Sequence, residues 1–181
     1  LGMIICLFRQ LPARDASVRR GDWSWFYEGR NGRQIEGKTI GLIGFGDIAK
    51  ALAKMLSVFG CHVIAYDIRW DNDAARELGV ERADIPTIQH KADVVSLHVP
   101  ATPSTVGMVD MEFLKGMKRD AVLINTARGS LIVEEDLAQA LRAGIIAAAG
   151  LDVFVKEPPD ADNPLLGLSN VLLLPHSGAG S

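Results

Sequence analysis

TIGLIGFGDIA, at residues 39–49, is the stretch of this sequence that decides the fold. Its first part, Thr39–Ile43, is a short apolar run of the kind that forms a strand buried on both faces of a sheet. Its second part turns through two glycines into Ile48–Phe59, where apolar residues recur with helical spacing. The stretch therefore predicts a strand, a tight turn and a helix in direct succession, which is typical of α/β folds.

The turn has the spacing G-x-G-x-x-G/A, with Gly44, Gly46 and Ala49 at its fixed positions. Gly44 allows the tight turn, Gly46 lets a ligand approach the backbone, and the small Ala49 allows the helix to pack closely on the sheet. The free N–H groups at the helix N-terminus favour an anion. We therefore predict that the pyrophosphate of a dinucleotide binds at Gly44, Phe45, Gly46, Asp47 and Ile48.

Two acids lie near this predicted phosphate site. Asp47 is in the first helical turn, and we expect its side chain to point away from the phosphates while its N–H faces the cofactor. Asp67 ends the strand His62–Tyr66, 21 residues after Gly46, where a carboxylate can bind the ribose hydroxyls and repel the 2′-phosphate of NADP. The alternative role for Asp67 is that of a plain turn residue. Arg69, two residues further on, could weaken the discrimination against NADP. The spacing favours NAD, with NADP as the less favoured cofactor.

Strands and helices alternate along the rest of the chain. The predicted strands are Thr39–Ile43, His62–Tyr66, Val94–His98, Ala121–Asn125, Ala147–Leu151 and Val171–Leu174. The predicted helices are Ile48–Phe59, Ala74–Leu78, Met111–Met117 and Glu134–Ala143. Such alternation implies right-handed crossovers between parallel strands, with helices on both faces. The predicted fold class is α/β, a three-layer doubly wound parallel sheet known as the Rossmann fold.

Ligands of such a sheet bind at the carboxyl ends of its strands, so the residues after each strand are candidate site residues. An arginine, an acid and a histidine reach this edge from three different strands. The candidates are His98, Val99, Pro100, Thr105, Thr126, Ala127, Arg128, Asp152, Glu157, His176 and Gly178. We predict that Glu157 acts in catalysis, that Arg128 and His176 act in catalysis and contact the cofactor, and that the others bind the cofactor.

Arg128, His176 and Glu157 have the side chains that hydride transfer to a 2-oxo acid requires. A guanidinium offers two parallel donors to the substrate carboxylate. An imidazole can deliver a proton to the carbonyl oxygen, and a carboxylate can orient the imidazolium and favour its charged form. The plain alternatives are a solvated loop arginine, a structural histidine and a surface acid. Their convergence beside a phosphate loop favours catalytic roles.

Several motifs, in the same order, resemble the D-isomer-specific 2-hydroxyacid dehydrogenase family. The segment Gly37–Gly46 looks like the family's first strand and phosphate loop. Residues 125–132, Asn-Thr-Ala-Arg-Gly-Ser-Leu-Ile, are similar to its arginine motif. Gly150–Phe154, followed by Glu157-Pro158, resembles the family's acid motif. Leu174-Pro175-His176 resembles its histidine motif.

This resemblance runs through nearly the whole chain, and it implies the same three catalytic residues. It also implies that Thr126, Ala127 and Asp152 lie around the nicotinamide ring. In the family a substrate domain precedes this region and the chain returns to it at the end. We therefore expect a separate substrate domain outside this chain, and an isolated chain that binds cofactor without turnover. Glycerate, phosphoglycerate, lactate and longer 2-hydroxy acids all remain possible substrates.

The first 36 residues differ in character from the rest. Leu1–Leu11 is typical of the end of a buried helix, and it has no cap before it, so we expect the sequence to begin inside a longer protein. Trp23, Trp25, Phe26 and Tyr27 form either a partner surface or a connecting arm that packs on its own domain. Family members commonly pair through this region. We predict a connecting helix and arm at 1–36, a homodimer contact there, and an NAD-binding domain at 37–181.

Composition excludes several classes of partner. The 19 Lys and Arg against 22 Asp and Glu give a net charge of −3, which offers no general attraction to nucleic acid or to an anionic membrane. Cys6 and Cys61 match no metal spacing, so we predict no metal site and favour a reduced, cytoplasmic setting. The apolar run Leu1–Phe8 is too short to span a bilayer and lacks the features of a signal peptide.

Three other functions remain open at this point. A non-catalytic, NAD-sensing corepressor of the same fold can retain the catalytic residues. A different enzyme of this fold could oxidise formate or phosphite or hydrolyse a homocysteine adduct, but formate-type relatives are expected to carry Gln where this chain has Glu157. An independent NAD-binding module is the third, and the uncapped first helix counts against it.

Overall fold

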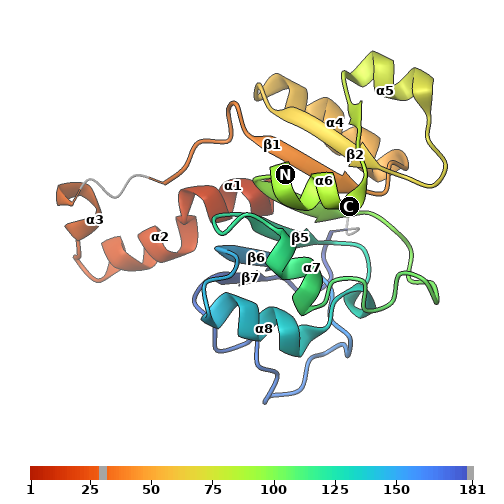
Figure 1. The fold of residues 1–181 in the computed structure, drawn as a ribbon. Coiled ribbons are helices and arrows are strands. Elements are labelled where there is room, and N and C mark those ends of the chain that lie inside the picture. The colour runs from red at the N-terminus through yellow and green to blue at the C-terminus, as the bar shows by residue number, and fades with distance from the viewer. Residues whose placement is uncertain (29–31, 179–181) are drawn as a thin grey trace.

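The structure is a computed structural model that describes residues 1–28 and 32–178. Residues 29–31 of the predicted arm and 179–181 of the predicted domain lie outside the described residues. Within the described residues, seven parallel strands form one sheet in the order β3-β2-β1-β4-β5-β6-β7 (Figure 1). The strands are β1 (Thr39–Ile43), β2 (His62–Tyr66), β3 (Glu81–Arg82), β4 (Val94–Leu97), β5 (Val122–Asn125), β6 (Ala148–Leu151) and β7 (Val171–Leu173).

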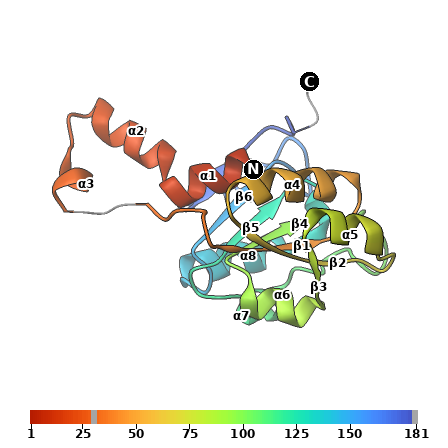
Figure 2. The ribbon, with the colours of Figure 1, turned by 90° about the horizontal axis from the view of Figure 1, so that it is seen from above.

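Helices cover both faces of this sheet, as the view in Figure 2 shows, so the predicted three-layer Rossmann fold is confirmed. α1, α4 and α5 pack on one face, and α6, α7 and α8 pack on the other. The helices are α1 (Gly2–Arg9), α2 (Leu11–Arg19), α3 (Ser24–Tyr27), α4 (Asp47–Val58), α5 (Asn72–Leu78), α6 (Ile85–Lys91), α7 (Met111–Gly116) and α8 (Glu134–Arg142).

The strand β1 shows how the sequence produces two cores. Its side chains alternate between the faces, so Ile40 and Leu42 join the core under α1 and α4 while Ile43 joins the core under α6, α7 and α8. Gly41 has no side chain, and a Cβ there would lie 2.4 Å from the Ile88 side chain on α6. The missing side chain therefore lets α6 lie directly on the centre of the sheet.

The predicted elements agree with the structure to within one or two residues, but some elements were not predicted. α6 was missed although its start carries two signals: Pro86 in its first turn and Asp84, which accepts a hydrogen bond from the Thr87 N–H at 2.9 Å. α2 follows α1 after the left-handed Gln10, whose φ is 53°. The prediction that every strand is buried on both faces is wrong for β7, which lies at the sheet edge and is half-buried.

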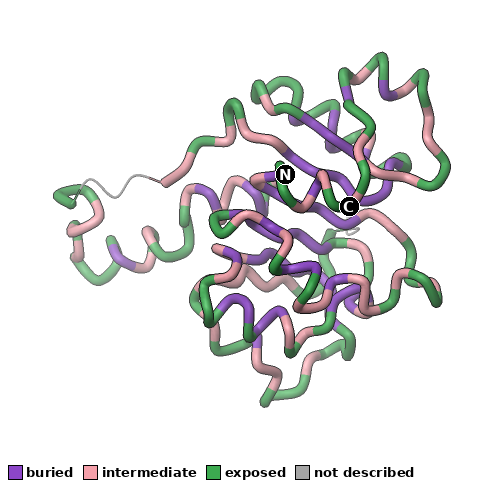
Figure 3. The backbone as a smooth tube through the Cα atoms, viewed as in Figure 1, coloured by how far each residue is buried: buried purple, intermediate pink, exposed green. Residues whose placement is uncertain are grey.

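The first helix packs on the sheet through one buried face, whereas the arm after it does not pack on the sheet. Phe8 and Ile4 of α1 pack into the sheet core, whereas α2 and α3 extend away from the sheet (Figures 1 and 3). Trp23, Phe26 and Tyr27 are 56%, 75% and 81% exposed, so these rings do not pack on their own domain. None of the helices in residues 1–28 and 32–178 has both the length and the apolarity to cross a bilayer.

Candidate active site

The order of the strands reverses between β1 and β4, and this switch point is where open α/β sheets bind ligands. Gly44 lies there with φ +100°, and a Cβ on it would come within 2.6 Å of the His98 carbonyl oxygen. Its N–H donates to the Tyr66 carbonyl at 2.8 Å. Only glycine fits this position, which fixes the phosphate loop between the ends of β2 and β4.

The N-terminus of α4 has the features that a pyrophosphate site needs. α5, α6 and α7 each begin with an Asp side chain that accepts a hydrogen bond from a backbone N–H. The residue that precedes α4 is Gly46, and no side chain of the described residues caps this helix in the same way. A Cβ on Gly46 would also meet no atom of the described residues within 4 Å. The free amides and the open space fit a dinucleotide pyrophosphate, and the exposed Asp47 stands beside them.

Asp67 is tied to the phosphate loop by the backbone. Its Oδ2 accepts a hydrogen bond from the Phe45 N–H at 2.7 Å, and its Oδ1 accepts one from the Arg69 N–H, also at 2.7 Å. Each carboxylate oxygen retains a lone pair for a further donor. The carboxylate is thus oriented before any ligand arrives, at the position predicted for the ribose hydroxyls.

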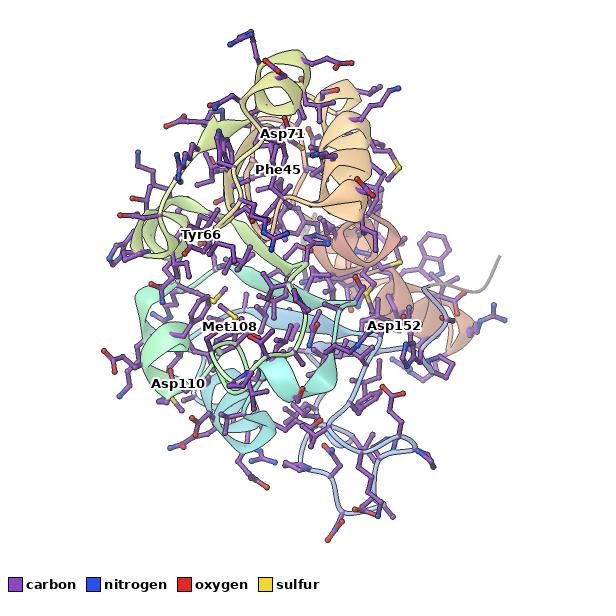
Figure 4. The ribbon with its side chains drawn as sticks, turned by 90° about the vertical axis from the view of Figure 1, so that its right-hand side faces the viewer. Phe45, Tyr66, Asp71, Met108, Asp110 and Asp152 are labelled. Atoms are coloured by element: carbon purple, nitrogen blue, oxygen red, sulfur yellow. The ribbon has the colours of Figure 1, made fainter. Side chains whose placement is uncertain are left out.

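A stacked aromatic pair lies beside this loop. The ring of Phe45 is buried and stacks on Trp70, with ring centres 5.0 Å apart. Lys50 of α4 pairs with Asp71 at 2.7 Å, and this hydrogen bond raises the pKa of Lys50 and lowers the pKa of Asp71. Figure 4 shows Phe45 and Asp71 together at this end of the sheet.

The loop after β4 is held by its own polar groups. Thr105 accepts a hydrogen bond from the Thr102 N–H at 2.8 Å and donates its hydroxyl to the Pro100 carbonyl at 2.6 Å. The imidazole Nε2 of His98 lies 2.9 Å from the Ser96 hydroxyl, and burial lowers the pKa of His98 to about 4. His98 is therefore neutral near pH 7, and no charge of its own opposes or favours a ligand.

The Arg128 loop is held by a residue that the sequence analysis did not assign to the site. Asn125 is fully buried at the end of β5. Its Oδ1 accepts a hydrogen bond from the Ala127 N–H at 3.0 Å, and its Nδ2 donates to the Arg128 carbonyl at 2.9 Å. The signal for this role was a polar residue inside an otherwise apolar strand. Arg128 itself is exposed, and its guanidinium donates to the Ala127 carbonyl at 2.6 Å.

Glu157 and His176 form a hydrogen-bonded pair. Nδ1 of His176 lies 2.6 Å from Oε2 of Glu157, and Oε1 of Glu157 accepts a hydrogen bond from the Phe154 N–H at 3.0 Å. The hydrogen bond from His176, followed by that from Phe154, lowers the pKa of Glu157. The His176 and Glu157 side chains are 49% and 38% exposed. Together with Arg128 they line a cavity of about 310 Å³, so the three predicted catalytic residues lie around one space.

Asp152 anchors the chain just after His176. It is buried at the end of β6, at the position labelled in Figure 4. Its two carboxylate oxygens accept hydrogen bonds from the Ser177 and Gly178 N–H groups, at 2.8 and 2.7 Å. His176 has φ 53°, a left-handed conformation that a non-glycine residue adopts only when its surroundings enforce it. The predicted contacts of Asp152, Thr126 and Ala127 with the nicotinamide ring stay predictions.

Residues 1–178 match the model of a protein family described as D-isomer specific 2-hydroxyacid dehydrogenase, NAD binding domain. The chain is 41% identical over 182 residues to a D-3-phosphoglycerate dehydrogenase of Methanocaldococcus jannaschii, covering 100% of this chain and 34% of that protein. It is 42% identical over 180 residues to a glyoxylate reductase of Thermofilum pendens, covering 97% of this chain and 53% of that protein.

Solved structures show the same relationship. The NAD-complexed D-isomer specific 2-hydroxyacid dehydrogenase of Lactobacillus delbrueckii ssp. bulgaricus superposes with a TM-score of 0.84 at 35% identity, covering 96% of this chain and 57% of that chain. An acyclic imino acid reductase in complex with NADPH and D-Arg has a TM-score of 0.85 at 36% identity, covering 96% and 54%. The chain thus spans between one third and three fifths of the length of these relatives. Motifs, fold and similarity agree, and the chain belongs to the D-isomer specific 2-hydroxyacid dehydrogenase family through its NAD-binding domain.

Proposed function

We propose that this chain supplies the cofactor domain and three reacting side chains of an enzyme that interconverts a D-2-hydroxy acid and its 2-oxo acid. The observation that carries the proposal is the hydrogen-bonded pair of Glu157 and His176, which faces the same cavity as Arg128. These three side chains come from different loops, and hydride transfer to a 2-oxo acid needs this combination of a cation, an acid and a charge partner.

Each side chain has a defined part in reduction. Arg128 binds the substrate carboxylate through two parallel N–H groups. His176, held through Nδ1 by Glu157, uses its Nε2 to give a proton to the carbonyl oxygen. The Glu157 carboxylate stabilises the imidazolium before that transfer. In the opposite direction the neutral imidazole accepts the proton of the hydroxyl group. A nicotinamide cofactor, held at Gly44–Ile48 and at Asp67, would supply or accept the hydride.

We propose NAD as the cofactor in preference to NADP. The phosphates would lie against the amides of Gly44–Ile48, and the adenosine ribose against Asp67. Both oxygens of the Asp67 carboxylate already accept backbone N–H groups, so the carboxylate is held in place and would face a 2′-phosphate at close range. Arg69, the neighbouring cation, is the residue that could reduce the discrimination. Isothermal titration of this chain with NAD and with NADP tests the preference, and equal affinities would contradict it.

Turnover by the longer protein that we expect to contain this chain tests the catalytic function. The assay follows NADH oxidation with a panel of 2-oxo acids: glyoxylate, hydroxypyruvate, phosphohydroxypyruvate, pyruvate and longer homologues. We expect reduction of at least one of them, with loss of turnover in Arg128→Ala and His176→Ala. Tight NAD binding without turnover of any substrate would instead support the non-catalytic, NAD-sensing alternative.

We also propose that two copies of the protein pair through the arm. Phe26 and Tyr27 contact each other edge to face, 5.5 Å between ring centres, yet both rings are exposed on α3. Apolar rings exposed on a projecting segment are typical of an interface. Light scattering at micromolar concentration should give the mass of a dimer for the longer protein. The double variant Phe26→Ser, Tyr27→Ser should shift the measured mass toward that of the monomer. A longer protein that is monomeric without these substitutions would refute the pairing.

A further inference from the structure

The peptide bond between Phe154 and Val155 belongs to the loop that carries Glu157, and it contacts the loop that carries Arg128. Gly129, next to Arg128, presses on it so closely that a Cβ there would lie 1.9 Å from the Phe154 carbonyl carbon. The Val155 N–H of the same peptide donates a hydrogen bond to Oε1 of Glu134 at 2.9 Å. The Phe154 N–H donates to Glu157. The backbone that directs Glu157 is therefore held by Gly129 and by Glu134.

Glu134 has a second contact that fixes its carboxylate. Its Oε2 accepts a hydrogen bond from the Asn163 side-chain amide at 2.7 Å. The Asn163 Oδ1 in turn accepts a hydrogen bond from the N–H of the fully buried Leu165 at 3.0 Å. Glu134 is the first residue of α8, where the helix dipole favours a negative charge. Its carboxylate therefore connects two points of the segment between β6 and β7, Val155 and Asn163, to the start of α8.

We propose that Glu134 is a positioning residue, which holds the turn from Phe154 to Glu157 so that the Glu157 carboxylate reaches His176. This proposal rests on the proposed function, because it assigns Glu134 a part in the same reaction. The effect passes from the Glu134 carboxylate to the Val155 N–H, through the backbone to the Phe154 N–H, and then to Glu157. Displacements of about 1 Å are enough to slow an enzyme strongly, so loss of this tether should be visible in turnover.

The first test needs no turnover and uses this chain. Carbon-13 NMR of the glutamate side-chain carboxyls follows the titration of Glu157, whose pKa is lowered by its hydrogen bonds to His176 and Phe154. In Glu134→Ala both hydrogen bonds should weaken, so the Glu157 midpoint should move upward, toward its ordinary value. The matched control is Glu135→Ala, since Glu135 is exposed in the same helical turn. Equal midpoints in the two variants would overturn the proposal.

The second test exchanges the two partners. Asn163→Asp alone places a second carboxylate against Glu134 and should shift the Glu157 midpoint upward, as Glu134→Ala does. Adding Glu134→Gln lets the new amide of residue 134 donate a hydrogen bond to the new carboxylate of residue 163. The amide oxygen of residue 134 still accepts from the Val155 N–H, and the carboxylate of residue 163 still accepts from the Leu165 N–H. The double variant should return the midpoint toward that of the wild type, and failure to do so would count against the proposal.

Turnover of the longer protein gives the third readout. Glu134→Ala should lower kcat on the order of tenfold, with unchanged NAD affinity and with recovery in the double variant. If the longer protein turns over no 2-oxo acid, the proposed function fails, while the NMR titration still decides whether Glu134 positions Glu157. If the longer protein is active and Glu134→Ala leaves its kcat unchanged, the positioning role of Glu134 is wrong.

Discussion

The proposed cofactor end of the site, at the loop Gly44–Ile48, and its proposed catalytic end, at Arg128, Glu157 and His176, are built by different means. At the cofactor end, a short stretch of chain provides the loop, the free amides and the place of Phe45, and Asp67 follows one strand later. At the catalytic end, the side chains are held by contacts between loops that are distant in sequence, such as Gly129 against Phe154. The backbone of the first end therefore comes mostly from one strand–turn–helix unit, whereas the second end depends on how loops from different strands meet.

Removal of the proposed proton donor, His176, should abolish most of the turnover and leave the proposed phosphate loop intact. In the longer protein, His176→Ala should lower kcat in both directions by about 10²- to 10⁴-fold at every pH. NAD affinity should fall much less than kcat, because His176 is one predicted cofactor contact among many and the proposed phosphate loop lies elsewhere in the fold. Steady-state rates and a cofactor titration check the two halves separately. A comparable loss of NAD affinity would show that the two ends are not independent.

Two glycine-to-alanine variants should affect different properties: Gly129→Ala the stability of the fold, and Gly46→Ala the binding of NAD. Gly129→Ala forces a Cβ to within 1.9 Å of backbone atoms, and overpacking of this kind costs about 1–3 kcal/mol or more in the free energy of unfolding. Gly46→Ala should leave that free energy nearly unchanged, since a Cβ there meets no described atom within 4 Å and φ is −81°. It should nevertheless weaken NAD binding. Urea unfolding and calorimetric titration of both variants measure the contrast, which equal stabilities would contradict.

Loss of the Asp67 carboxylate should affect the cofactor end alone. Asp67→Ala removes the proposed acceptor for the ribose hydroxyls and the acceptor of the Phe45 N–H. We expect NAD to bind roughly tenfold more weakly, which corresponds to about 1–2 kcal/mol for one lost hydrogen-bonding partner. Affinity for NADP should fall less, so the preference for NAD over NADP becomes smaller. Titration of both cofactors checks this, and Asp73→Ala serves as a control because Asp73 is an exposed acid on α5.

The smallest effect is a shift in pH dependence at the catalytic end. The hydrogen bond from His176 lowers the pKa of Glu157, so the carboxylate stays charged as the pH falls, until that lowered pKa is reached. The coupling is reciprocal, and the carboxylate favours the protonated imidazole that reduction requires. In Glu157→Gln the alkaline limit of reduction should therefore move to lower pH, while oxidation of the hydroxy acid suffers less. Superimposable reduction profiles would show that Glu157 does not act on His176.

Sequence reasoning predicted the fold because the decisive signals are local. The glycine spacing after β1, the apolar strands and the side chains that follow them all depend on neighbours in sequence. Reading the strand ends also brought Arg128, Glu157 and His176 together, since parallel strands present their carboxyl ends at one edge. The aromatic residues of the arm are also neighbours in sequence, so the sequence shows their cluster, although it did not predict α2.

The supporting residues could not be predicted from spacing. Glu134 contacts Val155 and Asn163 across 21 and 29 residues of sequence, and no periodicity reports such a contact. Asn125 acts on its own loop, but a buried amide in a strand has several possible partners, and only the folded turn selects the Ala127 and Arg128 backbone groups. The supporting side chains Asn125 and Glu134 are thus found in the structure, whereas the side chains proposed to react were already candidates in the sequence.

The stacking of Trp70 on Phe45 has an optical consequence. The sequence contains three tryptophans; Trp70 lies beside the phosphate loop, whereas Trp23 and Trp25 lie on the arm. Indole emission depends on the polarity and the ring contacts around it. With both arm tryptophans replaced by Phe, the remaining emission would come from the cofactor end. With Trp70 replaced by Phe, it would come from the segment proposed to pair with a second copy. Fluorescence can therefore follow cofactor binding and subunit association separately, in the same protein and without a label.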